Sequence, residues 1–368
     1  MNAFLKAKGA PAAVVAAALC LAASACTSSG TTAPSAGGSN NSAAAQQTVA
    51  PSGSDSGPGC TYQTYAGGVP KLDVTDGKTI VGFSQSESTS NPFRATETDS
   101  ITQQAQKLGV KLIQRNANAD VNAQNSQIED MIAQGAQVLI VAPENSAGLG
   151  PALAEAKAKK IPVLTIDRTA TGTACSDFIA FIGSNFYGQA QIAADDLGGA
   201  TGGTAQVAVL TGTPGNNVST DRTNGFTSEI ATKYPNIKVV ATQTGNFDQT
   251  DAQNAMAQIL QAHPGITAVY AENDEMAFGA IQAIISAGKT PGKDIKIVSI
   301  DGTQQAVQDV VSGQLVADIE TNPRFGPLAF QSLQDFYGTT GVPANVIIKD
   351  SHFTGSNAAS ALSSGLVY

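Results

Sequence analysis

The chain contains little of what a metal-dependent or nucleic-acid-binding protein needs, and it has no tryptophan. Its 368 residues include only two histidines, His263 and His352, which stand apart from each other and from the four cysteines. Such isolated histidines form no recognisable metal-binding spacing, and we expect neither a metal nor a cofactor. Lys and Arg number 20 against 29 Asp and Glu, so the formal net charge is −9. This balance argues against DNA or RNA as a partner, because nucleic-acid binding depends on basic side chains.

Long hydrophobic runs are also scarce. One nearly uninterrupted apolar stretch runs from Ala12 to Ala23. Lys6 and Lys8 precede it, and Ser24-Ala25-Cys26 follow it. A run this short, with basic residues before it and small residues after it, is typical of a signal peptide and not of a membrane-spanning helix. We therefore expect residues 1–25 to be a signal peptide and the protein to be exported.

The small residues that end at Cys26 resemble the lipobox of bacterial lipoproteins, in which that cysteine becomes the lipidated first residue. Ala23 replaces the usual Leu of this motif, so ordinary secretion with cleavage nearby is the alternative. Residues 27–59 are mostly small and polar, with one charge, Asp55, and no aromatic residue. Such a segment cannot bury enough apolar surface to fold. We expect residues 26–77 to form a lipidated cysteine and a disordered tether to the membrane.

The remaining cysteines form an even pair. Cys20 lies in the expected signal peptide and Cys26 would carry lipid, which leaves Cys60 and Cys175. In an exported protein an even pair of cysteines usually forms a disulfide. We predict a Cys60–Cys175 bridge that joins the end of the tether to a loop.

Short β-branched segments alternate with helical segments through the rest of the chain. Ile101, Ala105 and Leu108 share one face of a helix that Gly109 would end, and another helix is expected over 275–287. The expected strands are 79–83, 110–113, 137–141, 162–166, 178–182, 206–210, 238–241, 268–271 and 295–300. Strands alternating with helices imply parallel sheets covered by helices on both faces. The units are too many for one small sheet, so we predict an α/β fold of two doubly wound lobes.

Polar side chains collect where the expected strands end, which is where open parallel sheets bind ligands. Asp, Asn and Arg present paired, planar hydrogen-bonding groups that match adjacent hydroxyl groups on a ligand. Without tryptophan, Phe93 and Phe247 are the candidates for flat apolar contact. An Asp after a strand is often only a helix N-cap, but the recurrence at five strand ends favours a cleft. The residues are Ser84, Gln85, Glu87, Asn91, Arg94, Asp167, Arg168, Asn216, Asp221, Arg222, Glu272, Asn273, Asp274 and Asp301.

The chain resembles the type I periplasmic sugar-binding family, which includes the ribose- and galactose-type binding proteins of ABC transporters. The resemblance covers about 78–355 and rests on IVGFSQ with NPFR, QIEDMIAQG, IPVLTIDR, LTGTPG with DRTNGF, AENDEMAFGAIQA and SIDGT. AGKTPGKDIKIVSIDGT, ADIETNP and the Phe93-Arg94 pair are most similar to the galactofuranose-binding branch. The ribose-type pattern has two aromatic residues after Asn-Pro, so this pair argues against ribose itself.

The resemblance implies one ligand site between two lobes that close about a three-segment hinge. Crossovers between the lobes are expected near Ser184, Thr321 and Asp350. Lobe 1 would comprise 78–183 with 322–348, and lobe 2 would comprise 184–321 with 349–368. The predicted ligand-binding residues are Gln85, Asn91, Phe93, Arg94, Asp167, Arg168, Arg222, Phe247, Asn273, Asp301 and Glu320, with Thr321 as the alternative to Glu320.

The function implied is that of an exported, lipid-anchored, monomeric binding protein that delivers one monosaccharide to an ABC transporter permease. Galactofuranose or a related galactose form is the first expectation, then another pentose or hexose, then a cyclic polyol or signalling furanose.

A receptor protein that binds a sugar-type signal is one alternative. A carbohydrate-active enzyme is the other, since Asp221 with Asp301 could serve glycoside hydrolysis. No GxSxG elbow is present, and Gly288-Lys289-Thr290 follows a helix instead of opening one as a P-loop would, so an enzyme is not expected.

Overall fold

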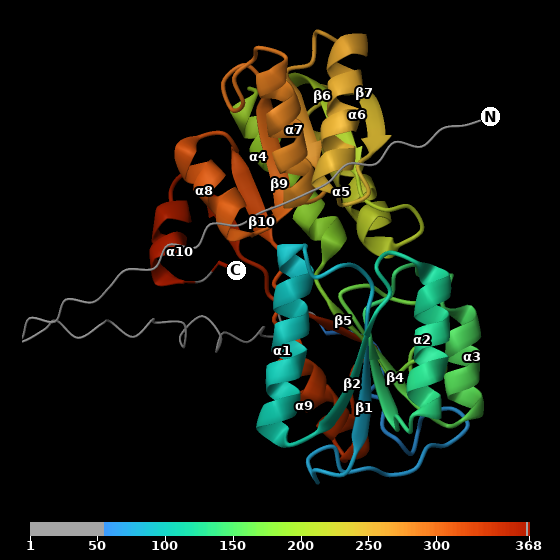
Figure 1. The fold of residues 1–368 in the computed structure, drawn as a ribbon. Coiled ribbons are helices and arrows are strands. Elements are labelled where there is room, and N and C mark those ends of the chain that lie inside the picture. The colour runs from blue at the N-terminus through green and yellow to red at the C-terminus, as the bar shows by residue number, and fades with distance from the viewer. Residues whose placement is uncertain (1–54, 366) are drawn as a thin grey trace, which may run out of the picture. The chain divides into compact units, whose positions relative to one another are not determined.

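The computed structural model describes residues 55–365 and 367–368, whose strands form two six-stranded sheets in two lobes (Figure 1). The strand order is β11-β5-β4-β3-β1-β2 in lobe 1 and β12-β10-β9-β8-β6-β7 in lobe 2. Lobe 1 contains β1 (Ile80–Gln85), β2 (Lys111–Asn116), β3 (Val138–Val141), β4 (Val163–Ile166), β5 (Phe181–Gly183) and β11 (Asn345–Ile347). Lobe 2 contains β6 (Thr204–Thr211), β7 (Asn236–Thr244), β8 (Ala268–Ala271), β9 (Lys296–Asp301), β10 (Ala317–Glu320) and β12 (His352–Thr354).

Neighbouring strands run parallel, except that β12 pairs antiparallel with β10. The predicted fold class of two doubly wound α/β lobes is therefore confirmed. The nine expected strands correspond to β1–β9, whereas β10, β11 and β12 were not expected. All four residues of the central strand β3 are buried, as a parallel strand covered on both faces requires.

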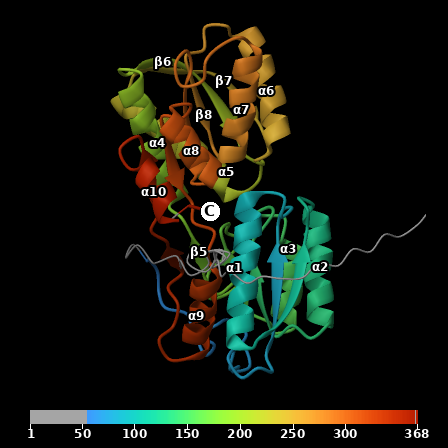
Figure 2. The same cartoon turned by 60° about the vertical axis from the view of Figure 1, so that its left-hand side comes forward.

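Helices cover both faces of each sheet (Figures 1 and 2). In lobe 1, α1 (Pro92–Leu108) and α9 (Gly326–Tyr337) share one core, and α2 (Val121–Ala133) and α3 (Gly150–Ala158) share the other. In lobe 2, one core includes α4 (Phe186–Ala200) and α5 (Asn217–Lys233), and the other includes α6 (Gln249–Ala262), α7 (Asp274–Ser286), α8 (Gln304–Ser312) and α10 (Ala358–Ser364). Val207 and Val209 of β6 enter the first of these cores and Ala208 and Leu210 the second, because successive strand residues point to opposite faces.

The chain passes between the two sheets three times. The first passage follows β5 at Ser184, the second follows β10, and the third lies between β11 and β12. Consequently the second passage returns α9 and β11 to lobe 1, and the third returns β12 and α10 to lobe 2. Residues remote in the sequence thereby meet at the boundary between the lobes.

An N-terminal strap of residues 55–77 lies against lobe 1. The strap makes antiparallel bridges from Ser56 to Asn345 and from Cys60 to Val342, and buries Tyr65 in the core that contains α9. Cys60 forms a disulfide with Cys175, as predicted. The strap is thus fixed to lobe 1 by covalent, backbone and apolar contacts, so the expectation of a disordered tether over 26–77 is wrong for residues 55–77, which Tyr65 and Val74 anchor in the core.

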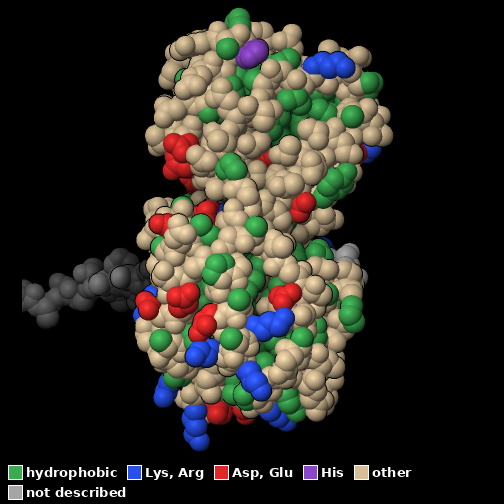
Figure 3. Space-filling view, turned by 90° about the vertical axis from the view of Figure 1, so that its right-hand side faces the viewer, with side chains coloured by type: hydrophobic (Ala, Val, Ile, Leu, Met, Phe, Trp, Pro, Cys, Tyr) green, Lys and Arg blue, Asp and Glu red, His purple; other side chains and the backbone are tan. Residues whose placement is uncertain are grey.

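Surface charge is mixed on the face that Figure 3 displays, where basic side chains are interspersed with acidic ones. Such a face does not resemble the continuous basic stripe of a nucleic-acid-binding protein. Among the helices of the described residues, none combines the length and the apolar character needed to cross a membrane.

We predict that replacing both Cys60 and Cys175 by Ser lowers the free energy of unfolding by about 2–4 kcal/mol, because the bridge spans a long chain segment and restricts the unfolded chain. The bridged residues are 115 positions apart. Urea unfolding of the wild type with and without reductant, beside the double variant, measures this difference. Equal stability of the oxidised wild type and the double variant would contradict the prediction.

Candidate functional site

A polar cavity lies between the lobes, where the carboxyl ends of strands from both sheets meet. Its empty volume is about 320 Å3, which includes space open to solvent. The cavity is lined by Glu87, Asn91, Phe93, Arg94, Asp167, Arg168, Val218, Arg222, Phe247, Asn273 and Asp301. Six of these eleven residues are ionisable and two are aromatic, so the cavity suits a small polar ligand that also has an apolar face.

The structure brings nine of the eleven predicted ligand-binding residues to this cavity: Asn91, Phe93, Arg94, Asp167, Arg168, Arg222, Phe247, Asn273 and Asp301. The other two lie behind it. Gln85 ends β1 inside lobe 1, and its amide donates to Glu97 at 2.8 Å and to Thr98 at 3.1 Å. Glu320 ends β10, and its carboxylate accepts from the backbone N–H of Ser351 at 3.1 Å. Both side chains are therefore engaged in holding neighbouring segments.

Two lining residues were not among the predicted ligand-binding residues. Glu87 follows β1 and was expected only as one of the polar residues that collect at the strand ends. Val218 lies in the first turn of α5 and is apolar, so no polar signal could have identified it. Its ion pair with Arg94, a predicted ligand-binding residue, is what brings Glu87 to the cavity.

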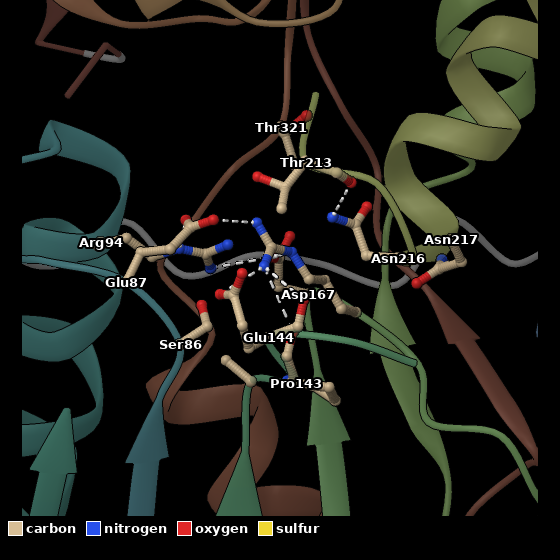
Figure 4. A network of polar contacts seen from close by, with 12 residues as sticks. Ser86, Glu87, Arg94, Pro143, Glu144, Asp167, Thr213, Asn216, Asn217 and Thr321 are labelled. Carbon is tan, nitrogen blue, oxygen red and sulfur yellow. Dashed lines mark hydrogen bonds and ion pairs between the residues drawn. The ribbon is translucent and has the colours of Figure 1, made fainter. Parts of the chain in front are cut away.

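In lobe 1, Arg94 and Arg168 form one ion-pair network around Glu87 (Figure 4). Glu87 Oε2 lies 2.9 Å from Arg94 Nε, and Glu87 Oε1 lies 2.6 Å from Arg168 Nη2. Asp167 Oδ2 lies 2.7 Å from Arg94 Nη1, and Glu144 Oε2 lies 3.3 Å from Arg168 Nη1. Because charged side chains out of water are stable only when paired, this network holds both guanidinium groups in one position.

The two arginines also determine which carboxyl groups of this network ionise. Burial opposes the ionisation of Glu87, but the charges of Arg168 and Arg94 outweigh it and hold the pKa of Glu87 at about 2. Burial raises the pKa of Glu97 to about 7 despite the charge of Arg94. Burial likewise raises the pKa of Glu144 to about 7 despite the charge of Arg168. The arginine charges thus favour the ionised form of Glu87, whereas burial favours the protonated forms of Glu97 and Glu144.

In lobe 2, Arg222 of α5 is the central charged residue. Its Nη2 donates to Asp301 Oδ1 at 3.0 Å and to Thr321 Oγ1 at 2.7 Å, and its Nη1 donates to the carbonyl oxygen of Glu272. Burial raises the pKa of Asp301 to about 7, with the charge of Arg222 acting in the opposite direction. The guanidinium also lies 5.5 Å from the centre of the Phe186 ring, a favourable cation–π distance.

The cavity retains hydrogen-bonding groups that a ligand could use. The Nε–H groups of Arg168 and Arg222 are buried and make no hydrogen bond among the described residues, although Arg168 Nε lies 3.7 Å from Asp167 Oδ2. Asn91 and Asn273 cap α1 and α7 with their side-chain oxygens, which leaves each amide NH2 group to donate elsewhere. Buried donors of this kind normally have partners, so these groups indicate a ligand rich in acceptors.

Two phenylalanines provide the apolar surfaces of the cavity. Phe93 lies in the first turn of α1, with the Arg94 guanidinium 4.9 Å from its ring centre. Phe247 comes from lobe 2, and Arg168 of lobe 1 lies 5.5 Å from its ring centre. A side chain at Gly212 would place its Cβ 1.9 Å from the Phe247 ring, so this loop accommodates Phe247 only because residue 212 is glycine.

The lobes touch directly at the rim of the cleft. The backbone N–H of Thr169 donates to Asn217 Oδ1 at 3.0 Å, and that of Asn217 donates to Ser146 Oγ at 3.2 Å. The N–H of Ser146 donates to the carbonyl oxygen of Gly215 at 3.0 Å. Ser146 and Thr169 follow strands of lobe 1, whereas Gly215 and Asn217 belong to lobe 2, so the structure represents a closed arrangement.

Gln189 of α4 connects the three passages between the lobes. Its Nε2 lies within hydrogen-bonding distance of the Glu320 carbonyl oxygen (3.0 Å), Thr321 Oγ1 (2.9 Å) and Asp350 Oδ2 (2.8 Å). Asp350 Oδ1 in turn accepts from Ser184 Oγ at 2.9 Å. Gln189 Oε1 accepts from Arg222 Nη2 at 3.3 Å. A residue that lines the cavity is thereby hydrogen-bonded to the hinge.

Comparison with protein-family models matches residues 81–335 to the periplasmic binding protein domain. The chain is 35% identical over 246 residues to the ribose import binding protein of Bacillus subtilis strain 168, which covers 67% of this chain and 77% of that protein. It is 32% identical over 275 residues to the galactofuranose-binding protein of Escherichia coli K12, covering 74% and 86%.

Solved structures give a similar result. A galactofuranose-binding protein superposes with a TM-score of 0.74 at 31% identity, covering 78% of this chain and 98% of that one. The arabinose-binding protein of Shewanella sp. ANA-3, bound to α- and β-L-arabinofuranose, has a TM-score of 0.74 at 35% identity, covering 77% and 95%. A Mycobacterium smegmatis protein in complex with β-D-fucofuranose has a TM-score of 0.73 at 33% identity, covering 77% and 94%.

We predict that Glu272→Gln reduces the pH dependence of stability. Burial raises the pKa of Glu272 to about 7 from an ordinary 4.5, although Ser219 and Thr223 donate to its carboxylate. The folded state therefore binds this proton more tightly than the unfolded state does. The resulting contribution to the free energy of unfolding is fully present below about pH 4.5 and is lost as the pH rises through about 7. Glutamine removes this titration, so the loss of unfolding free energy between pH 5 and pH 8 should shrink by at least ~1 kcal/mol.

Urea unfolding at both pH values measures the change. Glu155→Gln is the control, since the Glu155 side chain is 41% exposed on α3 and its carboxylate lies 3.9 Å from the Lys159 ammonium group. An undiminished pH dependence in Glu272→Gln would show that Glu272 does not bind this proton.

Proposed function

Because the chain belongs to the periplasmic binding protein family, we propose that it is the extracytoplasmic binding component of an ABC importer for one monosaccharide. The observation that carries this proposal is the convergence of Asn91, Arg94 and Arg168 from lobe 1 with Arg222 and Asp301 from lobe 2 on one small cavity. Carboxylates and guanidinium groups match pairs of adjacent hydroxyl groups, and the phenylalanines suit the C–H face of a sugar ring. The chain is a binding protein and not an enzyme.

The charge balance of the cavity supports a neutral ligand. Arg94 is paired with Glu87 and Asp167, Arg168 with Glu87, and Arg222 with Asp301. No guanidinium that lines the cavity lacks a carboxylate partner, so a phosphate or carboxylate on the ligand would have to compete with Glu87 or Asp301. Hydroxyl groups impose no such competition, because they donate to carboxylates and accept from N–H groups.

Within the monosaccharides we favour a furanose, with galactofuranose first, followed by other pentoses or hexoses. Three similar solved structures are described as binding galactofuranose, arabinofuranose or fucofuranose. The Phe93-Arg94 pair of this chain supports the same choice, since Arg94 lines the cavity and takes the sequence position at which the ribose-type pattern has its second aromatic residue. Binding measurements with a panel of monosaccharides would identify the sugar.

A second candidate is a receptor role in which the bound sugar is a signal. It is favoured by the similarity to the fructose-binding periplasmic domain of a hybrid two-component system, which superposes with a TM-score of 0.71 at 26% identity and covers 77% of this chain. Deletion of the gene separates the two roles. Loss of sugar uptake supports the importer, and loss of a sugar-dependent response with uptake intact supports the receptor.

We predict that a binding sugar raises the melting temperature of the wild type in a concentration-dependent way, since it stabilises only the folded state. Arg168→Ala and Asp301→Ala should each weaken binding by more than ~2 kcal/mol, because each removes a charged hydrogen-bonding group. The probes are D-galactose, L-arabinose, D-ribose, D-fucose, D-fructose and myo-inositol, with D-galacturonate as the charged analogue. Thermal shift identifies the ligand and calorimetry measures its affinity.

Lys157→Ala is the matched control for these variants, because Lys157 forms an exposed ion pair with Asp177 at 2.8 Å on the surface of lobe 1. It should bind as the wild type does. Unchanged affinity in both Arg168→Ala and Asp301→Ala would remove the residue assignment, and the absence of any sugar-dependent shift in the wild type would remove the proposed function.

We also propose that the protein is a monomer anchored to the outer face of the membrane through a lipid on Cys26, which lies outside the described residues. A permease that receives the sugar is the expected partner, as for ABC importers in general.

We predict that Cys26→Ser moves the protein from the membrane fraction to the soluble fraction and abolishes the incorporation of labelled fatty acid. Cys60→Ser is the control and should stay in the membrane fraction. A Cys26→Ser protein that still sediments with membranes would contradict the anchor.

A further inference from the structure

The backbone of Asp301 has an unusual conformation for a residue with a side chain. Its φ is +147°, a region that favours glycine, and Gly302 follows with φ +84°. Such conformations cost free energy and persist only where surrounding contacts hold them. Asp301 is also the last residue of β9, and its carboxylate lines the cavity and pairs with Arg222. Holding this backbone in place therefore also holds the carboxylate that faces the cavity.

Two donors hold the carbonyl oxygen of Asp301. The backbone N–H of Thr321 donates to it at 2.8 Å, and the hydroxyl group of Tyr368 donates to it at 3.0 Å. The Thr321 contact belongs to the pairing between neighbouring segments of the lobe 2 sheet. The Tyr368 contact is of a different kind, because it comes from a side chain 67 positions away along the chain.

Tyr368 is itself fixed from several directions. Its carbonyl oxygen accepts from the N–H of Gln304 at 2.7 Å, at the start of α8 in lobe 2. Its ring lies 5.7 Å from the guanidinium of Arg324, which follows the second passage between the lobes and donates to the carbonyl oxygen of Val367 at 3.1 Å. In both ribbon views the C-terminal end of the chain is marked between the lobes, beside α1 and α10 (Figures 1 and 2).

The ring of Tyr368 also reaches lobe 1. It packs edge-on against Phe93, with the ring centres 6.2 Å apart and the planes at 73°. Phe93 is one of the two aromatic residues that line the cavity. Tyr368 thus contacts one cavity-lining residue from each lobe: Phe93 through its ring and Asp301 through its hydroxyl group.

The hydroxyl group of Tyr368 acts as a donor across the physiological pH range. Burial raises its pKa well above the ordinary value of 10, and the nearby carboxyl groups of Asp301, Asp274, Asp318 and Glu320 act in the same direction. A phenol that keeps its proton remains a hydrogen-bond donor to the carbonyl oxygen at every physiological pH.

We propose that Tyr368 is a positioning residue of the binding site, which holds Asp301 in its ligand-binding conformation and joins it to Phe93 when the lobes close. This inference rests on the proposed function, because it assigns Asp301 a role in ligand binding. Tyr368 lies outside the family match at 81–335 and does not line the cavity. Its effect on the ligand is therefore exerted through Asp301 and Phe93.

The test compares Tyr368→Phe with Tyr187→Phe. Tyr368→Phe keeps the ring and removes the hydroxyl group, whereas Tyr187 is 39% exposed on α4 and serves as the control. For whichever probe sugar stabilises the wild type, Tyr368→Phe should weaken affinity about 3- to 10-fold, the range expected for one lost hydrogen bond. Tyr187→Phe should bind as the wild type does, and Tyr368→Ala should lose more than Tyr368→Phe because the contact with Phe93 also disappears.

A double variant distinguishes positioning from a general loss of stability. If Tyr368 acts through Asp301, Tyr368→Phe should cause no further loss of affinity in an Asp301→Ala background. A loss of the same size in both backgrounds would overturn the proposal. So would an affinity of Tyr368→Phe equal to that of the wild type.

Hydrogen exchange supplies a measurement that needs no sugar. In the ligand-free protein, Tyr368→Phe should speed exchange in the segment that contains Asp301 and Gln304, whereas Tyr187→Phe should not. Unchanged exchange there would overturn the proposal even if no probe sugar binds. Conversely, a wild type that binds no sugar while Tyr368→Phe accelerates exchange would remove the proposed function and leave the contact with Asp301 established.

Discussion

Three arginines that are almost completely buried impose the main constraint on this structure. Arg94, Arg168 and Arg222 are 2–3% exposed, and a guanidinium group cannot be deprotonated to escape the cost of leaving water. Each must therefore be matched by carboxylates and carbonyl groups within hydrogen-bonding distance. Glu87 serves two of them at once, with 2.9 and 2.6 Å contacts, and this double pairing keeps its own charge in a buried position. The hydrogen-bonding groups around the cavity are consequently fixed before a ligand arrives.

The parallel topology makes this pairing possible. Glu87 follows β1 and Arg168 follows β4, strands separated in the sheet by β3, and their carboxyl ends lie at the same edge. Arg94 reaches the same point because Asn91 caps α1 and aims the first turn of the helix there. In lobe 2, Arg222 is bonded to Asp301 and also, through Gln189 and Thr321, to the passages that join the lobes. The site and the hinge thus share hydrogen bonds through Arg222.

Sequence reasoning succeeded where one rule connects residue type to position. Strand ends in parallel sheets meet at one edge, so polar residues after strands could be expected to converge, and eight of the residues expected on this ground line the cavity. The same rule failed for Gln85, because a residue at the end of a strand can turn either toward the cleft or back into its lobe. Glu320 was expected only from the family resemblance, and its carboxylate instead accepts from the backbone N–H of Ser351. Strand β10 was not expected, because Asp318 and Glu320 interrupt its apolar pattern although all four of its residues are buried. The three-residue strands β11 and β12 are too short to show any period.

The balance between open and closed forms follows from the strength of the contacts across the cleft. At the rim, Thr169, Ser146 and Asn217 take part in hydrogen bonds between neutral groups, each worth about 1 kcal/mol. A ligand that meets Arg168 in one lobe and Arg222 in the other adds hydrogen bonds to charged groups, each worth about 1.5–3 kcal/mol. Only contacts made in both lobes at once favour closure, since a ligand held by one lobe binds the open and closed forms equally. The distribution of the arginines over two lobes is therefore what allows a small ligand to determine the conformation of a large protein.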